Sequence, residues 1–384
     1  MLALLFSFTA LAATTIACGV PENLQRRDLV KTAIKNVHVW NGSKFGPEST
    51  VVFINGVLSN ANPSEASSVV DGKGGYLLPG LIDAHCHVQA CSQLESMRQY
   101  GVTTALDMGT FPYASLSACK APGLTDVRGS GAAGTVNGSS ISHFPGFPAD
   151  SFIPNPAAAK QFVADRLAEG VDYIKVFLDP LGPDDETLAT VVHAAHDAGK
   201  LVITHAASYA SYQQAVLAKA DIPCHTPLDQ VIDSSTVASL LANKQAVVPT
   251  LIMMESIVNN THAPYPVYET VAAGSVAAMY GGKVPIVVGS DANLSPYTPA
   301  NPPFGISLHE ELQLLVSAGV SPVDAIRGAT SLAAATFRLG DRGAIKPGLR
   351  ADLVLLADDP TIDISNTLSI QKVWIGGVEY DPSS

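Results

Sequence analysis

The sequence has few charged residues, and fewer basic than acidic ones. Charged residues make up 15% of the 384 residues, and 22 Lys and Arg stand against 34 Asp and Glu, which gives a formal net charge of −12. No basic run occurs in the chain. Because nucleic acid binding depends on cations that neutralise phosphates, we expect no nucleic acid partner. The length and a hydrophobic share of 47% suit one large α/β domain with an appendage, or two domains.

Cysteine is also scarce, and its spacing excludes two kinds of site. None of the five cysteines forms a CxxC pair, so neither a zinc ribbon nor a thioredoxin-like site is indicated. Cys86 and Cys224 each adjoin a histidine on an expected strand, and we interpret them as small core residues. A disulfide between Cys91 and Cys119 is open at this stage, because sequence alone does not give the pairing.

Apolar runs long enough to cross a membrane are missing. The apolar stretch "MLALLFSFTALAATTIAC" at the N-terminus is too short for a comfortable transmembrane helix and ends in small residues. We interpret residues 1–19 as a secretory signal, and we expect a secreted protein with no membrane partner. Asn-x-Ser/Thr sequons that could carry glycans lie at Asn41, Asn137, Asn259 and Asn293.

The two ends of the chain have a β-rich pattern. Residues 33–80 contain the strand-like stretches "AIKNVHVW", "STVVFING" and "SVVDGKGGYLLPG", and the C-terminal part contains "ADLVLLA" and "SIQKVWIGGVEY". We predict one small β-sandwich domain assembled from both ends, comprising residues 28–78 and 343–384.

The middle of the chain alternates strands with helices. Helical spacing and Gly stops mark "PAAAKQFVADRLAEG", "DETLATVVHAAHDAGK" and "SYQQAVLAKA". Eight strands are expected, at "GLIDAHCHV", "VTTALDM", "DVRGSGA", "VDYIKVFL", "KLVITHA", "ADIPCHT", "QAVVPTL" and "VPIVVGSDA". This count predicts an α/β fold with a (β/α)8 TIM barrel over residues 79–342. A doubly wound open sheet is the alternative, but the Gly-rich phosphate turn expected after its first strand is missing.

Metal-ligand residue types stand at the ends of these strands. His85 and His87 are two residues apart on one strand, so their side chains share a face about 7 Å apart, which suits two ligands of one ion. Further candidates follow on later strands: Lys175, His205, His225 and Asp291. Burying four imidazoles, an amine and a carboxylate without an ion would cost several kcal/mol, so a metal site at the carboxyl end of the barrel is favoured.

The segments that carry these residues resemble the amidohydrolase superfamily, in its imidazolonepropionase-like and prolidase-like group, which includes fungal ochratoxinases. They are "LLPGLIDAHCHV", "YIKVF", "THA", "HTPLD" and "GSDA", followed by the stretch from "HEELQLLVSAGV" to "GLRADLVLLADDP". The resemblance covers about residues 30–380 and implies a site for two divalent metal ions.

The resemblance also implies a role for each ligand. His85, His87 and Asp291 would hold the more buried metal, and His205 with His225 the more exposed one. Lys175, carboxylated by carbon dioxide, would bridge the two. Nitrogen-rich ligation favours zinc, with manganese, cobalt or iron as alternatives. Asp291 would also carry a proton from the attacking water to the leaving nitrogen.

The expected loops after the strands are aromatic, which suits an apolar or aromatic small-molecule substrate. The residues are Phe111, Tyr113, His143, Phe144, Phe147, Tyr209, Met253, Met254, Tyr297 and Phe304. Of these, His143 and Tyr209 are the candidates for hydrogen bonding to substrate. Arg128 is the main candidate for binding an anion, and Asp83 has either a supporting role beside His85 or a structural one. Glu310 and Glu311 are interpreted as a charged helix start.

We therefore expect a metal-dependent hydrolase of an amide C–N bond, with a dipeptide or an N-acyl amino acid as substrate. An alternative is opening of a lactone, or dehydration, decarboxylation or cyclisation of a small natural product. A barrel that only binds a small molecule, without catalysis, is a third interpretation. It predicts that metal-ligating residues have been lost, and this chain retains all six. The oligomeric state is left open, and a homo-oligomer is compatible with the sequence.

Overall fold

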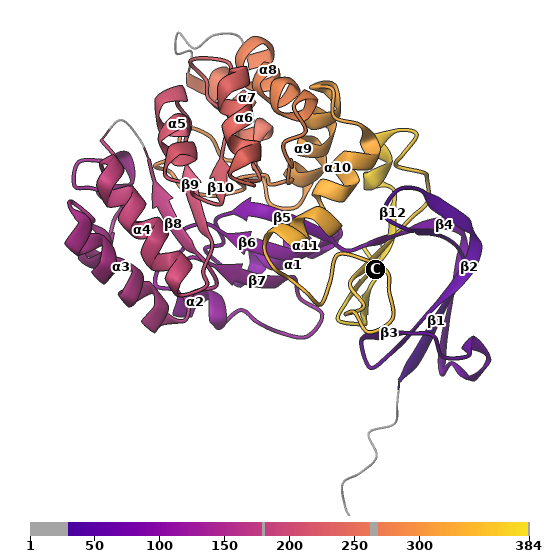
Figure 1. The fold of residues 1–384 in the computed structure, drawn as a ribbon. Helices are drawn as coiled ribbons and strands as arrows, with labels where there is room; N and C mark the ends of the chain where they lie inside the picture. The colour runs from indigo at the N-terminus through magenta and orange to yellow at the C-terminus, as the bar shows by residue number, and fades with distance from the viewer. Residues whose placement is uncertain (1–29, 179–180, 262–267, 383–384) are drawn as a thin grey trace, which may run out of the picture.

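The computed structural model describes residues 30–178, 181–261 and 268–382. The expected signal at residues 1–19 lies outside the described residues. Within the described ranges, no helix combines the length and the apolar character needed to span a membrane. Figure 1 shows a curved sheet at one end of the molecule and a body of strands and helices beside it.

Both ends of the chain contribute to one seven-stranded sheet. Its order is β13-β12-β11-β4-β1-β2-β3, and β4 joins the two ends by pairing with β1 in parallel and with β11 in antiparallel fashion. The strands are β1 (Lys31–Trp40), β2 (Phe45–Ile54), β3 (Val57–Ser59), β4 (Ser68–Pro79), β11 (Leu353–Leu356), β12 (Ile370–Ile375) and β13 (Val378–Tyr380).

This sheet curls over its own core, where the sequence led us to expect a sandwich of two sheets. Phe53 of β2 and Trp374 of β12 are both buried in one hydrophobic cluster, although their strands are far apart in the sheet order. The turns at Gly56 and Gly376 meet so closely that a Cβ on Gly56 would overlap the Gly376 carbonyl. A single curled sheet can therefore enclose the apolar residues that a second sheet would otherwise cover.

The parallel strands lie in two three-stranded sheets, β5-β6-β7 and β10-β9-β8. Their bounds are β5 (Leu81–Cys86), β6 (Val102–Asp107), β7 (Asp126–Gly129), β8 (Ile174–Phe177), β9 (Val202–His205) and β10 (Ile222–Cys224). Six of the eight expected central strands are thus found. The other two expected segments, 245–251 and 284–292, pair only through isolated bridges.

Those bridges connect the two parallel sheets. Gly134, beyond β7, bridges in parallel to Val176 of β8, and Val248 bridges to Cys224 of β10. Val247 in turn bridges to Ile286, and Ala292 bridges to Cys86 of β5. The assigned strands do not by themselves close a barrel, but each parallel segment is paired with the next one, either within a sheet or through an isolated bridge.

Helices surround these parallel strands (Figure 1). They are α1 (Cys91–Gln99), α2 (Ala114–Ser117), α3 (Pro156–Glu169), α4 (Asp185–Asp197), α5 (Tyr209–Leu217), α6 (Ser234–Ala242), α7 (Leu251–Thr261), α8 (Tyr268–Gly281), α9 (Ile306–Ser317), α10 (Pro322–Gly328) and α11 (Ser331–Thr336). Short 3-10 helices are η1 (Pro63–Glu65), η2 (Ser140–His143), η3 (Ala149–Ser151) and η4 (Ile364–Leu368).

Helix α3 shows how local sequence sets these boundaries. Asn155 caps it by accepting a hydrogen bond from the Ala158 amide, and Pro156 occupies the first turn, where an amide hydrogen is not needed. Gly170 ends the helix with a left-handed backbone, φ +81°. Phe162 and Val163 bury one side of the helix in the main hydrophobic cluster.

The cysteines and sequons can now be placed. Cys91 and Cys119 form a disulfide, which settles the open pairing, while Cys86 and Cys224 are free and buried, as expected. Asn293 is fully buried and its amide donates to the carbonyls of Asp291 and Ala300. Its sequon is therefore closed to a glycan, whereas those at Asn41, Asn137 and Asn259 are exposed.

Candidate metal centre

Three of the expected ligands form a compact group. His85 lies near the carboxyl end of β5, and His87 comes directly after this strand. Asp291 lies on the segment that pairs with β5 through the bridge from Ala292 to Cys86. The Oδ1 atom of Asp291 is 3.1 Å from Nε2 of His87 and 3.5 Å from Nε2 of His85. One ligand atom from each residue lies within 4.8 Å of the others, a spacing that can hold a metal ion.

Two more histidines continue this group. The His225 ring lies 4.9 Å from the His85 ring and 4.4 Å from the His205 ring, measured between centroids. Phe177, at the end of β8, stacks on His205 with its ring centroid 3.8 Å away and the planes inclined by 17°. The imidazoles of three strand ends therefore form one continuous cluster.

Lys175 of β8 is buried against this cluster. Its side chain is 2% exposed, and its Nζ makes no hydrogen bond with any described residue. Burial lowers the pKa of the amine, an effect that Cys224 and Asp291 partly oppose. Its positive charge is also near enough to lower the pKa of His85, His205 and His225.

The histidines are held in the form that binds metals. Burial lowers the pKa of His85, His205 and His225 well below the usual range, and the neighbouring cationic groups add to this effect. A neutral imidazole keeps a lone pair for an ion. Both ring nitrogens of His85, like the Lys175 amine, are buried and lack hydrogen-bond partners among the described residues. These polar atoms, together with the Asp291 carboxylate, fit divalent metal ions as their missing partners.

The backbone at the cluster is strained. His225 and Asp291 have φ values of +73° and +56°, and Thr250 has φ +49°. Side chains with a Cβ rarely adopt this region, and it is a true outlier for a β-branched residue such as threonine. Such conformations gather at functional sites, where the surrounding structure holds them in place.

Thr250 is a residue that the sequence reasoning missed. Its hydroxyl lies 2.8 Å from Nδ1 of His225, and it is fully buried. When Nδ1 donates this hydrogen bond, Nε2 is left with its lone pair free for a metal. A threonine near the end of the expected strand 245–251 gave no signal of this role, because the contact depends on the left-handed backbone of Thr250.

Asp83 ties the two ligand-bearing segments together. Its carboxylate accepts hydrogen bonds from the hydroxyl and amide of Ser290, at 2.5 and 3.0 Å, and from the amide of His85 at 3.2 Å. Burial raises the pKa of Asp83 to about 6, although these hydrogen bonds oppose the shift. Asp83 therefore fixes the backbone beside His85 and beside Asp291, which combines the supporting and structural roles that the sequence left open.

Several other expected residues point elsewhere. The Tyr209 hydroxyl donates to Asp233 at 2.8 Å, at the N-terminus of α6. His143 ends η2, is exposed, and makes no hydrogen bond with the described cluster residues. Glu311 lies in the middle of α9 and is fully buried, so it is no charged helix start. Its carboxylate instead accepts the Ile252 amide at 2.8 Å, at the N-terminus of α7.

The aromatic loop residues divide into two sets. Phe111 contacts Phe147 with ring centroids 5.7 Å apart, and Phe144 contacts Tyr297 at 5.5 Å, so the loops after separate strands meet through aromatic side chains. The remaining expected residues belong to the packed interior, since Tyr113, Met253, Met254 and Phe304 are buried in the main hydrophobic cluster.

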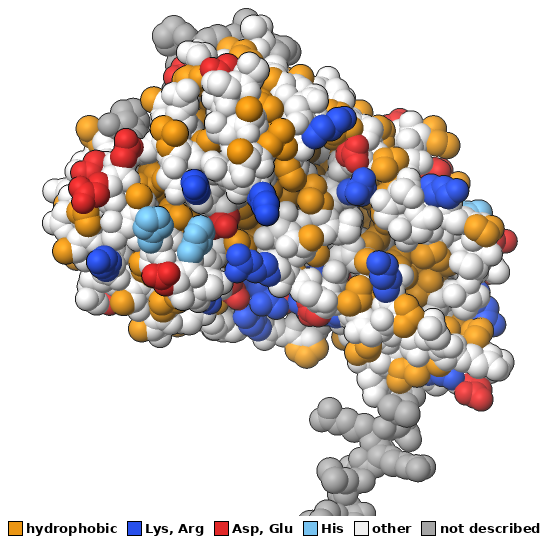
Figure 2. Space-filling model, viewed as in Figure 1, with side chains coloured by type: hydrophobic (Ala, Val, Ile, Leu, Met, Phe, Trp, Pro, Cys, Tyr) orange, Lys and Arg blue, Asp and Glu red, His pale blue; other side chains and the backbone are white. Residues whose placement is uncertain are grey.

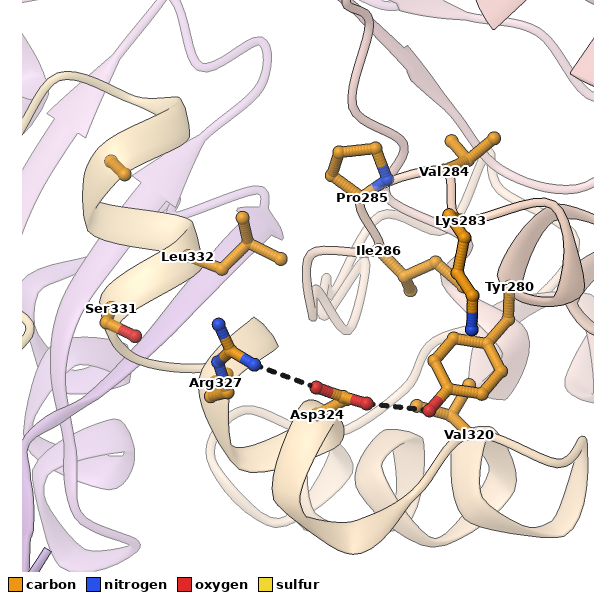
Figure 3. Close-up of a pocket in the computed structure, with 11 residues that line it drawn as sticks. Tyr280, Lys283, Val284, Pro285, Ile286, Val320, Asp324, Arg327, Ser331 and Leu332 are labelled. Carbon is orange, nitrogen blue, oxygen red and sulfur yellow. Dashed lines mark hydrogen bonds and ion pairs between the residues drawn. The ribbon is translucent and has the colours of Figure 1, made fainter. Parts of the chain in front are cut away.

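A separate cavity of about 450 Å³ lies between α8, α10 and α11 (Figure 3). Its walls include Pro285, Ile286 and Leu332, and a polar chain runs from Arg327 through Asp324 to the Tyr280 hydroxyl. None of the expected metal ligands lines it. The cavity is therefore distinct from the metal centre.

The profile of the Amidohydrolase family matches residues 76–379. The chain belongs to the amidohydrolase family. It is accordingly an enzyme, of a class of metal-dependent hydrolases that cleave carbon–nitrogen bonds. An uncharacterised protein of Mycobacterium tuberculosis (strain ATCC 25618 / H37Rv) is 26% identical over 309 residues, which are 70% of this chain and 78% of that protein. The imidazolonepropionase of Pyrobaculum arsenaticum is 28% identical over 214 residues, 53% of this chain and 48% of that enzyme.

Solved structures share the fold of this amidohydrolase. A Xaa-Pro dipeptidase with bound methionine in its active site superposes with a TM-score of 0.79 at 19% identity, covering 91% of this chain and 100% of the other. The ochratoxinase of A. niger gives a TM-score of 0.77 at 17% identity, covering 92% and 96%. Both likenesses confirm the mixed α/β fold expected from the sequence.

Proposed function

We propose that this amidohydrolase binds two divalent metal ions and hydrolyses an amide C–N bond of a small apolar or aromatic substrate, such as a dipeptide or an N-acyl amino acid. The observation that carries this proposal is the buried Lys175 amine, which has no hydrogen-bond partner among the described residues and lies against a cluster of imidazoles. A lysine in that position needs a partner that the protein itself does not supply.

Each ligand has a place in this proposal. His85, His87 and Asp291 would hold one metal, and His205 and His225 the other. Lys175 would lie between them as a carbamate formed with carbon dioxide, which converts an amine into an anionic bridging group. The nitrogen-rich donor set makes zinc the favoured ion. When bound, such ions polarise a carbonyl group and lower the pKa of water.

The protein's own residues would position the substrate and move the proton. Asp291 has both carboxylate oxygens directed at the cluster, Oδ1 toward His85 and His87 and Oδ2 toward His225. It would accept a proton from the attacking water and release it to the leaving nitrogen. His143 and Tyr209 remain our candidates for hydrogen bonding to the substrate, and Tyr209 would first have to leave Asp233. The paired aromatic residues of the loops, Phe144 with Tyr297 among them, support an apolar or aromatic substrate.

We also propose that the parallel segments close into an eight-stranded barrel over residues 79–342, with residues 28–78 and 343–384 as the second domain. Backbone hydrogen bonds support this, since the Val287 amide donates to Val247 and the Ala84 amide donates to Val288. Secretion after removal of residues 1–19 is proposed as well. The Cys91–Cys119 disulfide supports it, because disulfides persist in oxidising compartments.

The proposed function is tested by measuring metal content and product release together. We expect about two metals per wild-type chain and a large loss of metal in Lys175→Ala, with no loss in the control Lys160→Ala, which removes an exposed lysine of α3. Aromatic N-acyl amino acids and dipeptides should release a free amine. Wild-type protein with one metal or none would overturn the binuclear site, and turnover without a free amine would favour lactone opening or a non-hydrolytic reaction.

A further inference from the structure

A second cavity lies at the opposite end of β9 from the metal centre. Its volume is about 400 Å³, and its lining includes Lys200 and Leu201, which come directly before β9, whereas His205 is the last residue of that strand. Phe337 and Arg338, directly after α11, form another wall. The cavity is therefore separate from both the metal centre and the cavity beside α10.

The charges around this cavity are unbalanced. Arg128, Lys200 and Arg338 line it with one carboxylate, Asp172. Figure 2 shows Lys and Arg side chains gathered on the face between α4 and α11. In a chain of net charge −12, three cations around one small cavity are unexpected as an accident of composition.

Arg128 is held loosely by its acidic neighbours. Its guanidinium is 3.5 Å from Asp172 and 3.9 Å from Asp126, and its Nε is buried without a hydrogen-bond partner among the described residues. Asp172 already accepts hydrogen bonds at 2.9 Å from both the Tyr113 hydroxyl and the Gly129 amide. The Arg128 side chain is 35% exposed, so its fork of donors remains available to a ligand.

The other two cations keep donors free as well. Lys200 donates one hydrogen bond to the Val171 carbonyl at 2.6 Å, and Arg338 donates one to the Gly199 carbonyl at 2.9 Å. An ammonium has three donors and a guanidinium five, so each retains most of its capacity. Leu201 and Phe337 add an apolar wall beside these donors.

We propose that this cavity is an anion site for a phosphate group, either as inorganic phosphate or as a phosphate monoester whose organic part packs against Phe337 and Leu201. Guanidinium groups match the oxygens of a phosphate in a bidentate manner, and a lysine adds a point charge. Arg128 thus has the anion-binding role expected from the sequence, but at the end of the strands remote from the metal centre.

The test is calorimetric titration of the full metal-loaded protein with inorganic phosphate and, separately, with phenyl phosphate, at constant ionic strength. Saturable one-to-one binding tighter than about 10 mM is expected, and Arg128→Gln should weaken it about tenfold. Arg338→Gln, which alters an exposed residue, should weaken it in the same direction and guards against misfolding of the first variant. The matched control Arg327→Gln removes one cation from the other cavity and should leave binding unchanged.

Phosphate also coordinates divalent metals, so each titration is repeated with Asp291→Asn. Binding that persists in this variant and still depends on Arg128 supports the anion site, and tighter binding of phenyl phosphate than of phosphate identifies a monoester as the natural ligand class. Lack of saturable binding, equal loss in Arg327→Gln, or complete loss in Asp291→Asn would each overturn the proposal.

Discussion

The hydroxyl of Thr250 and the Nδ1 atom of His225 are 2.8 Å apart, between two neighbouring segments joined by the bridge from Val248 to Cys224. When Nδ1 donates this hydrogen bond, Nε2 of His225 keeps its lone pair. An outer hydrogen bond of this kind fixes the orientation and the tautomer of a ligating histidine.

Replacement of Thr250 by valine keeps the side-chain shape and removes this hydrogen bond. We expect Thr250→Val to weaken metal binding about ten- to hundredfold, with little change in the melting temperature of the metal-free protein. Metal affinity is measured by competition with a chelator. Thr226→Val is the matched control, because it removes a buried hydroxyl that has no hydrogen-bond partner among the described residues. Equal metal affinity in both variants would show that Thr250 does not position His225.

Gly289 brings the segment that carries Asp291 against β5. A Cβ at residue 289 would lie 2.8 Å from the His85 Cβ and 2.6 Å from Cγ1 of Val248. We therefore expect Gly289→Ala to displace His85, to lower metal content, and to cost about 1–3 kcal/mol of unfolding free energy through overpacking. Gly340→Ala is the control, since a Cβ there meets nothing within 4 Å. Both variants are compared by elemental analysis and denaturant unfolding, and an unchanged metal content in Gly289→Ala would contradict the expectation.

The sequence predicted that the candidate ligands lie near one another, for physical reasons. The spacing of His85 and His87 needs only the two-residue period of a strand. Lys175, His205 and Asp291 could be assigned to strand ends because parallel strands place their carboxyl ends on one face. The structure brings the rings of four histidines and the Asp291 carboxylate into one cluster, linked by pairwise contacts.

Other features could not be predicted, because they depend on backbone detail or on distant contacts. The left-handed conformation of Thr250 leaves no local sequence signal. The sequence singled out Arg128 as a candidate for binding an anion, but not the cavity that its side chain lines beside Lys200 and Arg338. Glu311 stands in a polar "HEEL" stretch, yet it is buried beside α7. Its hydrogen-bond partner there, the Ile252 amide, is 59 residues away in sequence. The expected β-sandwich is one sheet, because β4 pairs with β1 on one edge and with β11 on the other and so joins the strands of both chain ends.

Glu311 should make stability depend on pH. Burial raises the pKa of its carboxyl group from 4.5 to about 8, in spite of hydrogen bonds from the Ile252 and Leu251 amides. The folded state therefore holds a proton that the unfolded state releases, and the stabilisation present below pH 4.5 is lost as the pH rises toward 8. Glu311→Gln keeps the acceptor for the Ile252 amide and has no charge to desolvate.

We thus expect Glu311→Gln to be more stable than wild type at alkaline pH, by an amount on the order of a few kcal/mol, and to lose this advantage in acid. Denaturant unfolding across the pH range measures the difference. Glu310→Gln, on the partly exposed side of α9, should follow the wild-type curve. Parallel curves for wild type and Glu311→Gln would mean that Glu311 does not hold the proton.

The Cys91–Cys119 disulfide joins the first residue of α1 to the residue that follows α2 by two positions. It closes a loop with a sequence separation of 28 residues, and such a cross-link stabilises mainly by restricting the unfolded chain, by about 3.5 kcal/mol. We expect reduction of the wild type, or the double variant Cys91→Ser/Cys119→Ser, to lower the unfolding free energy by this amount. Reductant should leave the double variant unchanged, since Cys86 and Cys224 are buried free thiols. Because α1 begins four residues after His87, metal content measured on the same samples shows whether the cross-link also holds that ligand. Equal unfolding free energies of the wild type with and without reductant would show that the bond contributes nothing to stability.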